Sequence, residues 1–219
     1  MKHIIFKILI IFLLFACFIS VSAFSYAKMV STNISNSVFR LHVIANSDSS
    51  DDQALKYNVR DSLLSYMNSL CSITTSKEEA INIAKAHLSD FESLAQNVVL
   101  QNGFDYDVAV VIEDTTFPTK SYGDITLPAG TYEALNVKIG AASGHNWWCV
   151  MFPPLCFVDV SSGVVPNESK EILNNSMESE SYNLITSNNQ KTDINLKFKL
   201  VEFFSKYKVQ NSFKIKNML

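Results

Sequence analysis

The order of apolar and polar residues predicts one strand and two helices in the first half of the chain. Residues 38–45 are mostly apolar, with β-branched and aromatic side chains in partial alternation, which predicts a strand. Turn and cap residues at 46–50 end this strand. A helix is then predicted from an apolar stripe at every fourth position, formed by Leu55, Val59, Leu63 and Met67.

The second predicted helix has recognisable signals at both ends. Ser76 and Glu79 form a capping box, in which each side chain can satisfy a backbone N–H of the first turn. The pair Asn102-Gly103 ends the helix. The apolar stripe between them is Ala80, Ala84, Leu88, Phe91, Ala95 and Val98.

Further β-prone runs at 106–112, 117–122 and 132–139 are separated by short turns, which favour antiparallel neighbours. The expected fold class is therefore α+β. We expect a mixed or antiparallel sheet covered by two long helices and a C-terminal helix.

The N-terminus has the pattern of a signal peptide. Lysines at positions 2 and 7 precede an uncharged apolar run from Ile8 to Val21, which is shorter than the roughly 18 to 20 residues typical of a spanning helix. Residues 1–23 are predicted to be a signal peptide cleaved after Ala23, with cleavage after Ala27 or an uncleaved anchor as alternatives. The rest of the chain is then exported.

The exported part divides into three segments by composition. Residues 24–165 are predicted to form the main α+β domain. Residues 166–192, rich in Asn, Ser and Glu, are predicted to be a flexible polar segment. Residues 193–219 are predicted to contain a helix that docks on the domain, with a membrane-surface helix as the alternative, because Phe198, Val201, Phe204 and Tyr207 follow helical spacing.

Charge and cysteine content limit the classes of function. The formal net charge is −3, and removal of the two N-terminal lysines makes it −5; no basic stripe is present, so nucleic-acid binding is not expected. Cys149 and Cys156, separated by a Pro-Pro step, form a possible disulfide in an exported protein, with two reduced thiols as the alternative. Cys71 is expected to be free. No cofactor motif appears.

Residues 144–156 hold both tryptophans and suggest either a core or a recognition surface. His145 and Cys149 would share one face of a helix, but a strand would separate them by about 13 Å. A Cys149/His145 thiol hydrolase is therefore an alternative that also needs a third, orienting group. Ligand spacing does not support a metal site. Neighbouring Trp147 and Trp148 would face opposite sides of a sheet if they lie on a strand.

Arg40, His42 and Asn46 are polar residues in or beside an otherwise apolar strand. They indicate either a functional site or an edge strand with one solvent-exposed face. Asp48, Asp51 and Asp52 follow the strand, and helix capping explains them without a site.

Taken together, several blocks make the chain resemble the stage II sporulation protein R family of endospore-forming bacteria. The blocks are Phe39-Arg40-Leu41-His42-Val43-Ile44-Ala45-Asn46-Ser47-Asp48, Asp52-Gln53-Ala54-Leu55-Lys56, Val59-Arg60-Asp61, Gly130-Thr131-Tyr132-Glu133-Ala134-Leu135, Gly144-His145-Asn146-Trp147-Trp148-Cys149 and Phe152-Pro153-Pro154-Leu155-Cys156-Phe157. They cover the body from about residue 38 to 160.

The resemblance implies a signalling protein that is not itself an enzyme. Such a protein is secreted from the forespore into the intermembrane space of a sporulating bacterium. Its implied partner is a membrane-embedded, aspartic-type protease of the mother cell, which then processes the sigma-E precursor. The membrane would be contacted only through the signal segment. The candidate partner-binding residues are Arg40, His42, Asn46, His145, Asn146, Trp147 and Trp148. The alternative function is an extracellular hydrolase that uses Cys149 and His145 on cell-wall material.

Overall fold

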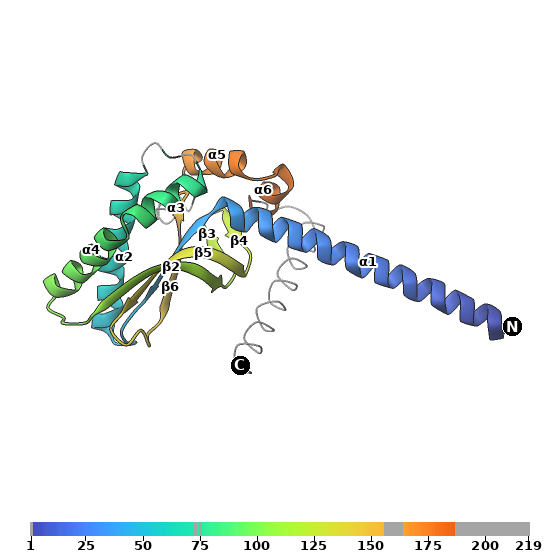
Figure 1. Cartoon of the computed structure of the whole chain (residues 1–219), viewed down its shortest axis with the longest axis horizontal. Helices are drawn as coiled ribbons and strands as arrows, with labels where there is room; N and C mark the ends of the chain where they lie inside the picture. Colours follow the sequence, from blue (N-terminus) through green and yellow to red (C-terminus); the bar gives the residue numbers. More distant parts are fainter. Residues whose placement is uncertain (1, 72–73, 75, 156–163, 187–219) are drawn as a thin grey trace.

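The computed structural model describes residues 2–71, 74, 76–155 and 164–186 of the chain. Twelve elements lie in these ranges (Figure 1): α1 (Lys2–Ser37), β1 (Phe39–Ile44), α2 (Ser50–Leu70), α3 (Lys77–Ala86), α4 (Leu88–Gln101), β2 (Val108–Phe117), β3 (Lys120–Tyr122), β4 (Ile125–Leu127), β5 (Gly130–Ile139), β6 (Asn146–Phe152), α5 (Asn167–Ser176) and α6 (Ser179–Thr186).

The main sheet is mixed and has the strand order β2-β5-β1-β6. Strand β1 runs parallel to β5 and antiparallel to β6, and β2 is antiparallel to β5. The strands β3 and β4 form a separate two-stranded ribbon. The predicted α+β class is confirmed, and of the two predicted sheet types, mixed or antiparallel, the sheet is mixed.

Helices α2, α3 and α4 cover one face of this sheet (Figure 1). The stripe predicted for α2 is buried there, since Leu55, Val59, Leu63 and Met67 are at most 2 % exposed. They pack against Leu41 and other inward-facing residues of the sheet. This burial is the main source of stability for an amphipathic helix.

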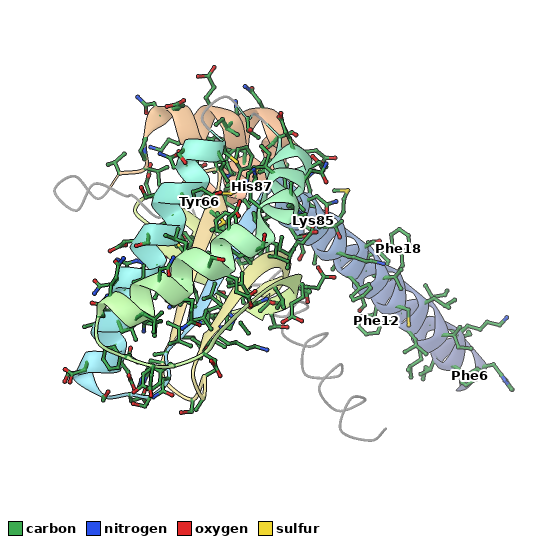
Figure 2. The ribbon with its side chains drawn as sticks, turned by 60° about the vertical axis from the view of Figure 1, so that its left-hand side comes forward. Phe6, Phe12, Phe18, Tyr66, Lys85 and His87 are labelled. Carbon is green, nitrogen blue, oxygen red and sulfur yellow. The ribbon has the colours of Figure 1, made fainter. Side chains whose placement is uncertain are left out.

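The single helix predicted between Ser76 and Asn102 is two helices, with a break at His87. The predicted cap is present, because the Ser76 side chain accepts a hydrogen bond from the Glu79 backbone N–H. At the break, His87 Nδ1 lies 2.7 Å from Asp90 Oδ2 and 3.2 Å from the Tyr66 hydroxyl. Figure 2 shows Tyr66 and His87 on adjoining helices. The apolar stripe continues through the break, so its spacing does not reveal it.

A second apolar cluster lies on the opposite face of the sheet. It joins the C-terminal part of α1, the β3–β4 ribbon, α5 and α6, with Ile34, Phe117, Ile125 and Leu173 fully buried. The predicted flexible segment 166–192 therefore differs from the structure over residues 167–186, which form α5 and α6. Their few apolar residues fall on one face and are buried, which the polar composition obscures. Residues 187–192 and the predicted helix at 193–219 lie outside the described residues.

Helix α1 is continuous across both predicted cleavage sites. Its N-terminal part extends away from the body, with Phe6, Phe12 and Phe18 exposed around it (Figure 2). By length and by a mean hydropathy of 3.0, it is apolar enough to cross a membrane, as signal sequences also are. Its C-terminal part belongs to the body, because Ala27, Val30 and Ile34 are at most 1 % exposed.

Candidate functional site

The candidate residues from two distant parts of the sequence meet because β1 and β6 are neighbours. The antiparallel register places His42 beside Trp148 and Ile44 beside Asn146. The structure thereby decides the open question of helix or strand for residues 146–152 in favour of a strand. It also places Trp147 and Trp148 on opposite faces, as a strand requires.

His42 lies at the centre of a polar and aromatic cluster. Its Nδ1 is 2.8 Å from Asn136 Oδ1, and its Nε2 is 2.7 Å from Asn146 Oδ1. Its ring stacks on Trp148 with centroids 3.8 Å apart. Burial lowers the pKa of His42 below its ordinary value, and the hydrogen bonds with the two asparagines oppose that shift only in part. The ring is therefore neutral near pH 7.

The sheet around His42 is open on this face. Trp148 and Ile44 are half-buried, while Asn146 is exposed. Alternate residues of β2 and β5 continue the same surface. We call this surface the open face; it comprises Ile44, Ala109, Val111, Glu113, Lys138, Asn146 and Trp148, with His42 and Asn136 beneath them. Its mixture of one half-exposed Trp, aliphatic side chains and amides is typical of a protein-contact surface.

Arg40 lies two residues before His42 on the same side of β1 but is completely buried. Its Nη2 donates to the Tyr122 hydroxyl at 2.6 Å, and its Nε donates to the Cys149 carbonyl at 3.3 Å. The guanidinium also lies over the Phe117 and Tyr132 rings, 3.9 and 4.7 Å from their centroids. Arg40, predicted as a contact residue, therefore cannot reach a partner in this structure, because the β3–β4 ribbon and Tyr132 enclose it.

Asn46 joins the loops at the end of β1. Its side chain donates to Asp52 Oδ2 at 2.9 Å and accepts from the Ala141 backbone N–H at 2.9 Å. Gly140 has a φ of 56°, and a side chain there would collide with Asn46. Asn46 is thus a loop-positioning residue rather than a free contact group.

His145 is 77 % exposed and is held by Asp48. Asp48 Oδ1 accepts hydrogen bonds from the His145 backbone N–H at 2.6 Å and from Nδ1 at 2.5 Å. The backbone hydrogen bond is the main reason why the pKa of Asp48 is below its usual value. With Nδ1 occupied, the imidazole presents Nε2 to solvent.

Trp147 packs on the helix-covered face, next to α2. Its ring meets Tyr57 edge-on at 5.3 Å, and the Arg60 guanidinium lies 4.3 Å from its centroid. Within the described part of the chain its indole N–H is buried without a hydrogen-bond partner. Trp147 is therefore mainly a packing residue, and Trp148 is the tryptophan of the open face.

Cys149 is 1 % exposed and disulfide-bonded. Cys17 and Cys71 are free thiols. The predicted partner Cys156 lies outside the described residues, so the Cys149–Cys156 pairing stays a prediction. A disulfide-bonded sulfur cannot act as a thiolate nucleophile. The described residues contain no group of three or more His, Cys, Asp and Glu side chains that could hold a metal.

Several residues around His42 and Arg40 are not predicted from the sequence. Asn136 lies in the apolar run of β5 and orients His42; its own amide donates to the Thr115 hydroxyl at 2.6 Å. A lone asparagine inside a buried strand is the available signal, because such a group needs partners. Phe117, Tyr122 and Tyr132 give no comparable signal, since aromatic residues are common in any strand.

Comparison with known proteins identifies the family to which the chain belongs. The model of the family described as stage II sporulation protein R matches residues 35–162, which contain β1 to β6 and every candidate site residue. The chain belongs to this family. Stage II sporulation protein R of Bacillus subtilis (strain 168) is 38 % identical over 138 residues, which are 63 % of this chain and 62 % of the relative. The chain thus spans less than two thirds of the relative's length. No solved structure matches it.

Membership in the stage II sporulation protein R family supports a role in sporulation. The matched region excludes most of α1 and all of α5 and α6. The second apolar cluster is thus only partly built from family-matched residues. The open face, by contrast, comes entirely from matched segments.

Proposed function

We propose that this protein is an exported sporulation signal that activates a membrane-embedded, aspartic-type protease of the mother cell, which then processes the sigma-E precursor. The protein acts by binding after its secretion from the forespore into the intermembrane space. Two findings support this proposal: the family match, and an N-terminal helix with the length and apolar character of a signal or anchor.

The open face is the surface that we propose contacts the protease. It combines a half-buried tryptophan, fixed by its stack on His42, with exposed Asn146 and Val111. A rigid, partly exposed aromatic residue loses little conformational entropy when a partner covers it, and tryptophan is enriched among residues that dominate binding energy. The matched family region supplies every residue of this surface.

No observation favours the cell-wall hydrolase. Cys149 is buried and disulfide-bonded, and His145 is oriented by Asp48 toward solvent. His145 directly precedes β6, and the four residue steps of extended chain from His145 to Cys149 separate the two residues by about 13 Å.

The test measures processing of the sigma-E precursor in cells that make the membrane protease, after addition of purified protein. Val111→Lys changes an exposed residue of the open face, 40 % exposed, and Leu100→Lys is the matched control on α4, 55 % exposed. We expect the first variant to lower processing by about tenfold or more, as a charge in a binding hot spot does, and the control to leave it unchanged.

Two results would contradict the proposal. Wild-type protein that fails to raise processing would exclude the activator role. Equal activity of Val111→Lys and wild type, together with equal activity of an Asn146→Lys variant, would exclude the open face as the contact surface.

A further inference from the structure

The two asparagines that flank His42 both turn an amide oxygen toward its ring. Asn136 Oδ1 lies 2.8 Å from Nδ1, and Asn146 Oδ1 lies 2.7 Å from Nε2. An amide oxygen can only accept a hydrogen bond, so both contacts are hydrogen bonds only when each ring nitrogen carries a proton. This arrangement of donors and acceptors therefore belongs to the positively charged form of His42.

The neutral form of His42 needs a different arrangement. The ring is 7 % exposed, and burial disfavours its charged form. A neutral imidazole has one N–H group and one bare nitrogen, so loss of a proton leaves one of the two amide oxygens opposite a lone pair. One of the two amides must then turn, so that its NH2 group donates to the bare nitrogen.

The surroundings of the two amides decide which of them turns. Asn136 is 2 % exposed, and its Nδ2 donates to Thr115 Oγ1 at 2.6 Å, so its rotation would break a buried hydrogen bond. The Thr115 hydroxyl in turn donates to the Glu113 carbonyl at 3.5 Å. Asn146 is exposed, and within the described chain His42 is the one hydrogen-bond partner of its side chain. Asn146 can therefore turn without loss of any other hydrogen bond.

We propose that His42 and Asn146 form a proton-coupled switch on the open face. In the neutral state, Nδ1–H of His42 donates to Asn136, Nε2 accepts from Asn146 Nδ2, and the Asn146 oxygen points away from the ring. In the protonated state, Nε2–H donates to Asn146 Oδ1, and the NH2 group points away instead. One proton thus changes a hydrogen-bond acceptor into a donor on the surface that carries Trp148.

The charged neighbours of His42 set the pH at which this change occurs. Lys138 of β5 lowers the pKa of His42 in addition to burial, whereas Glu113 of β2 raises it. Arg40, on the same side of β1, is a further positive charge, and the tryptophan and asparagine of β6 beside the ring are uncharged. We therefore expect the change in acid, below the ordinary histidine pKa of about 6.5.

The consequence for binding deepens the proposed function and rests on it. A protease group that donates to Asn146 would meet an oxygen at neutral pH and an NH2 group in acid, and a group that accepts would meet the reverse. The same group cannot be satisfied in both states, and an unpaired polar group in an interface is costly. The switch itself belongs to this chain alone, so it can be tested without the protease.

The test is a pH titration by nitrogen-15 NMR of the labelled chain that begins at Phe24. Residues 3–22 are exposed and contribute nothing to either apolar cluster, so this chain keeps both clusters. We expect Nε2 to be the unprotonated ring nitrogen of His42 at neutral pH. A scalar coupling across the hydrogen bond from Asn146 Nδ2 to Nε2 should be present at neutral pH and disappear with the midpoint at which the ring takes up its proton.

Matched charge variants test the contact at Nε2. Asn146→Asp places a carboxylate, which can only accept, beside this nitrogen, and we expect it to raise the midpoint of His42 by about 1 to 3 pH units. The control Asn97→Asp adds the same charge at an exposed position of α4, which covers the opposite face of the sheet. We expect the control to move the midpoint by about 0.3 units or less at physiological salt.

Any of three results would overturn the switch: a neutral ring with its proton on Nε2, a neutral ring without the coupling to Asn146 Nδ2, or equal midpoint shifts in the two variants. The titration contains no protease, so its outcome is separate from that of the processing assay. Failure of the switch would leave the proposed function standing, and failure of the processing assay would leave the switch assigned.

Discussion

The membership of residues 24–37 in the folded body can be tested by truncating Ile34. This side chain is 0 % exposed and lies in the cluster of Phe117, Ile125 and Leu173. Ile34→Ala removes three carbons, which costs about 2.4 kcal/mol at roughly 0.8 kcal/mol per buried methylene. The cavity left behind adds to this loss, so we expect a total of about 3 to 4 kcal/mol in the free energy of unfolding.

The assay is urea unfolding of the chain that begins at Phe24, followed by circular dichroism, with the midpoint and slope compared between variants. Met29→Ala is the control on the same helix, because Met29 is 47 % exposed and methionine and alanine are both good helix formers. We expect the control to change the free energy of unfolding by about 0.5 kcal/mol or less. A similarly small effect of Ile34→Ala would refute the assignment of this part of α1 to the body.

Three further variants test the loops and the buried polar network. Burial raises the pKa of Asp52, but hydrogen bonds from Ser47 and Asn46 outweigh this effect and hold the pKa below the usual 3.8. The stability that results is present above pH 3.8 and is lost as the pH falls through the lower pKa of the folded state. We therefore expect Asp52→Asn to be less stable than the wild type at neutral pH and to lose less stability in an acid titration. Tyr122→Phe removes the hydrogen bonds to Arg40 and to the Trp148 carbonyl and should cost about 1 to 3 kcal/mol in urea unfolding, whereas the half-exposed Tyr57→Phe should cost little. Gly144→Ala would push a side chain into the Ser47 carbonyl and should lower the melting temperature far more than the control Gly103→Ala. At Gly103 an added side chain meets open space, and only the φ of 84° should cost about 1 to 2 kcal/mol. Equal losses of melting temperature would show that the Gly144 contact is relieved at no cost.

The sequence predicts what depends on neighbours along the chain. The Ser76 cap and the buried stripe of α2 follow from spacing, because a helix face is defined by residues three and four apart. The α+β class also follows, but the choice between a mixed and an antiparallel sheet does not, because it depends on the parallel pairing of β1 with β5. The break at His87 does not, since the apolar stripe runs through it unchanged and the contact of His87 with Tyr66 comes from another helix.

The open question at residues 146–152 shows the same limit. Spacing between His145 and Cys149 fits a helix and a strand equally well, and only pairing with β1 decides. The candidate site is therefore half predictable. His42, Asn146 and Trp148 stand out in the sequence, but Asn136, which orients His42 from β5, becomes meaningful only through the parallel register of β1 and β5.

Arg40 and His42 show why burial could not be assigned from spacing. They are two residues apart on one face of β1, yet Arg40 is enclosed and His42 adjoins the open face, because Tyr122 of the β3–β4 ribbon packs on Arg40, whereas His42 contacts Trp148 and Asn146 of β6. Arg40 has no carboxylate among its hydrogen-bond partners in the described chain, and a buried cation of this kind is costly. Its hydrogen bonds connect neighbouring strands. It links β1 to the β6 backbone at Cys149 and to Tyr122, whose hydroxyl donates to the Trp148 carbonyl. Arg40 thus holds, directly at Cys149 and through Tyr122 at Trp148, the β6 backbone that carries the tryptophan of the open face, although Arg40 itself is buried.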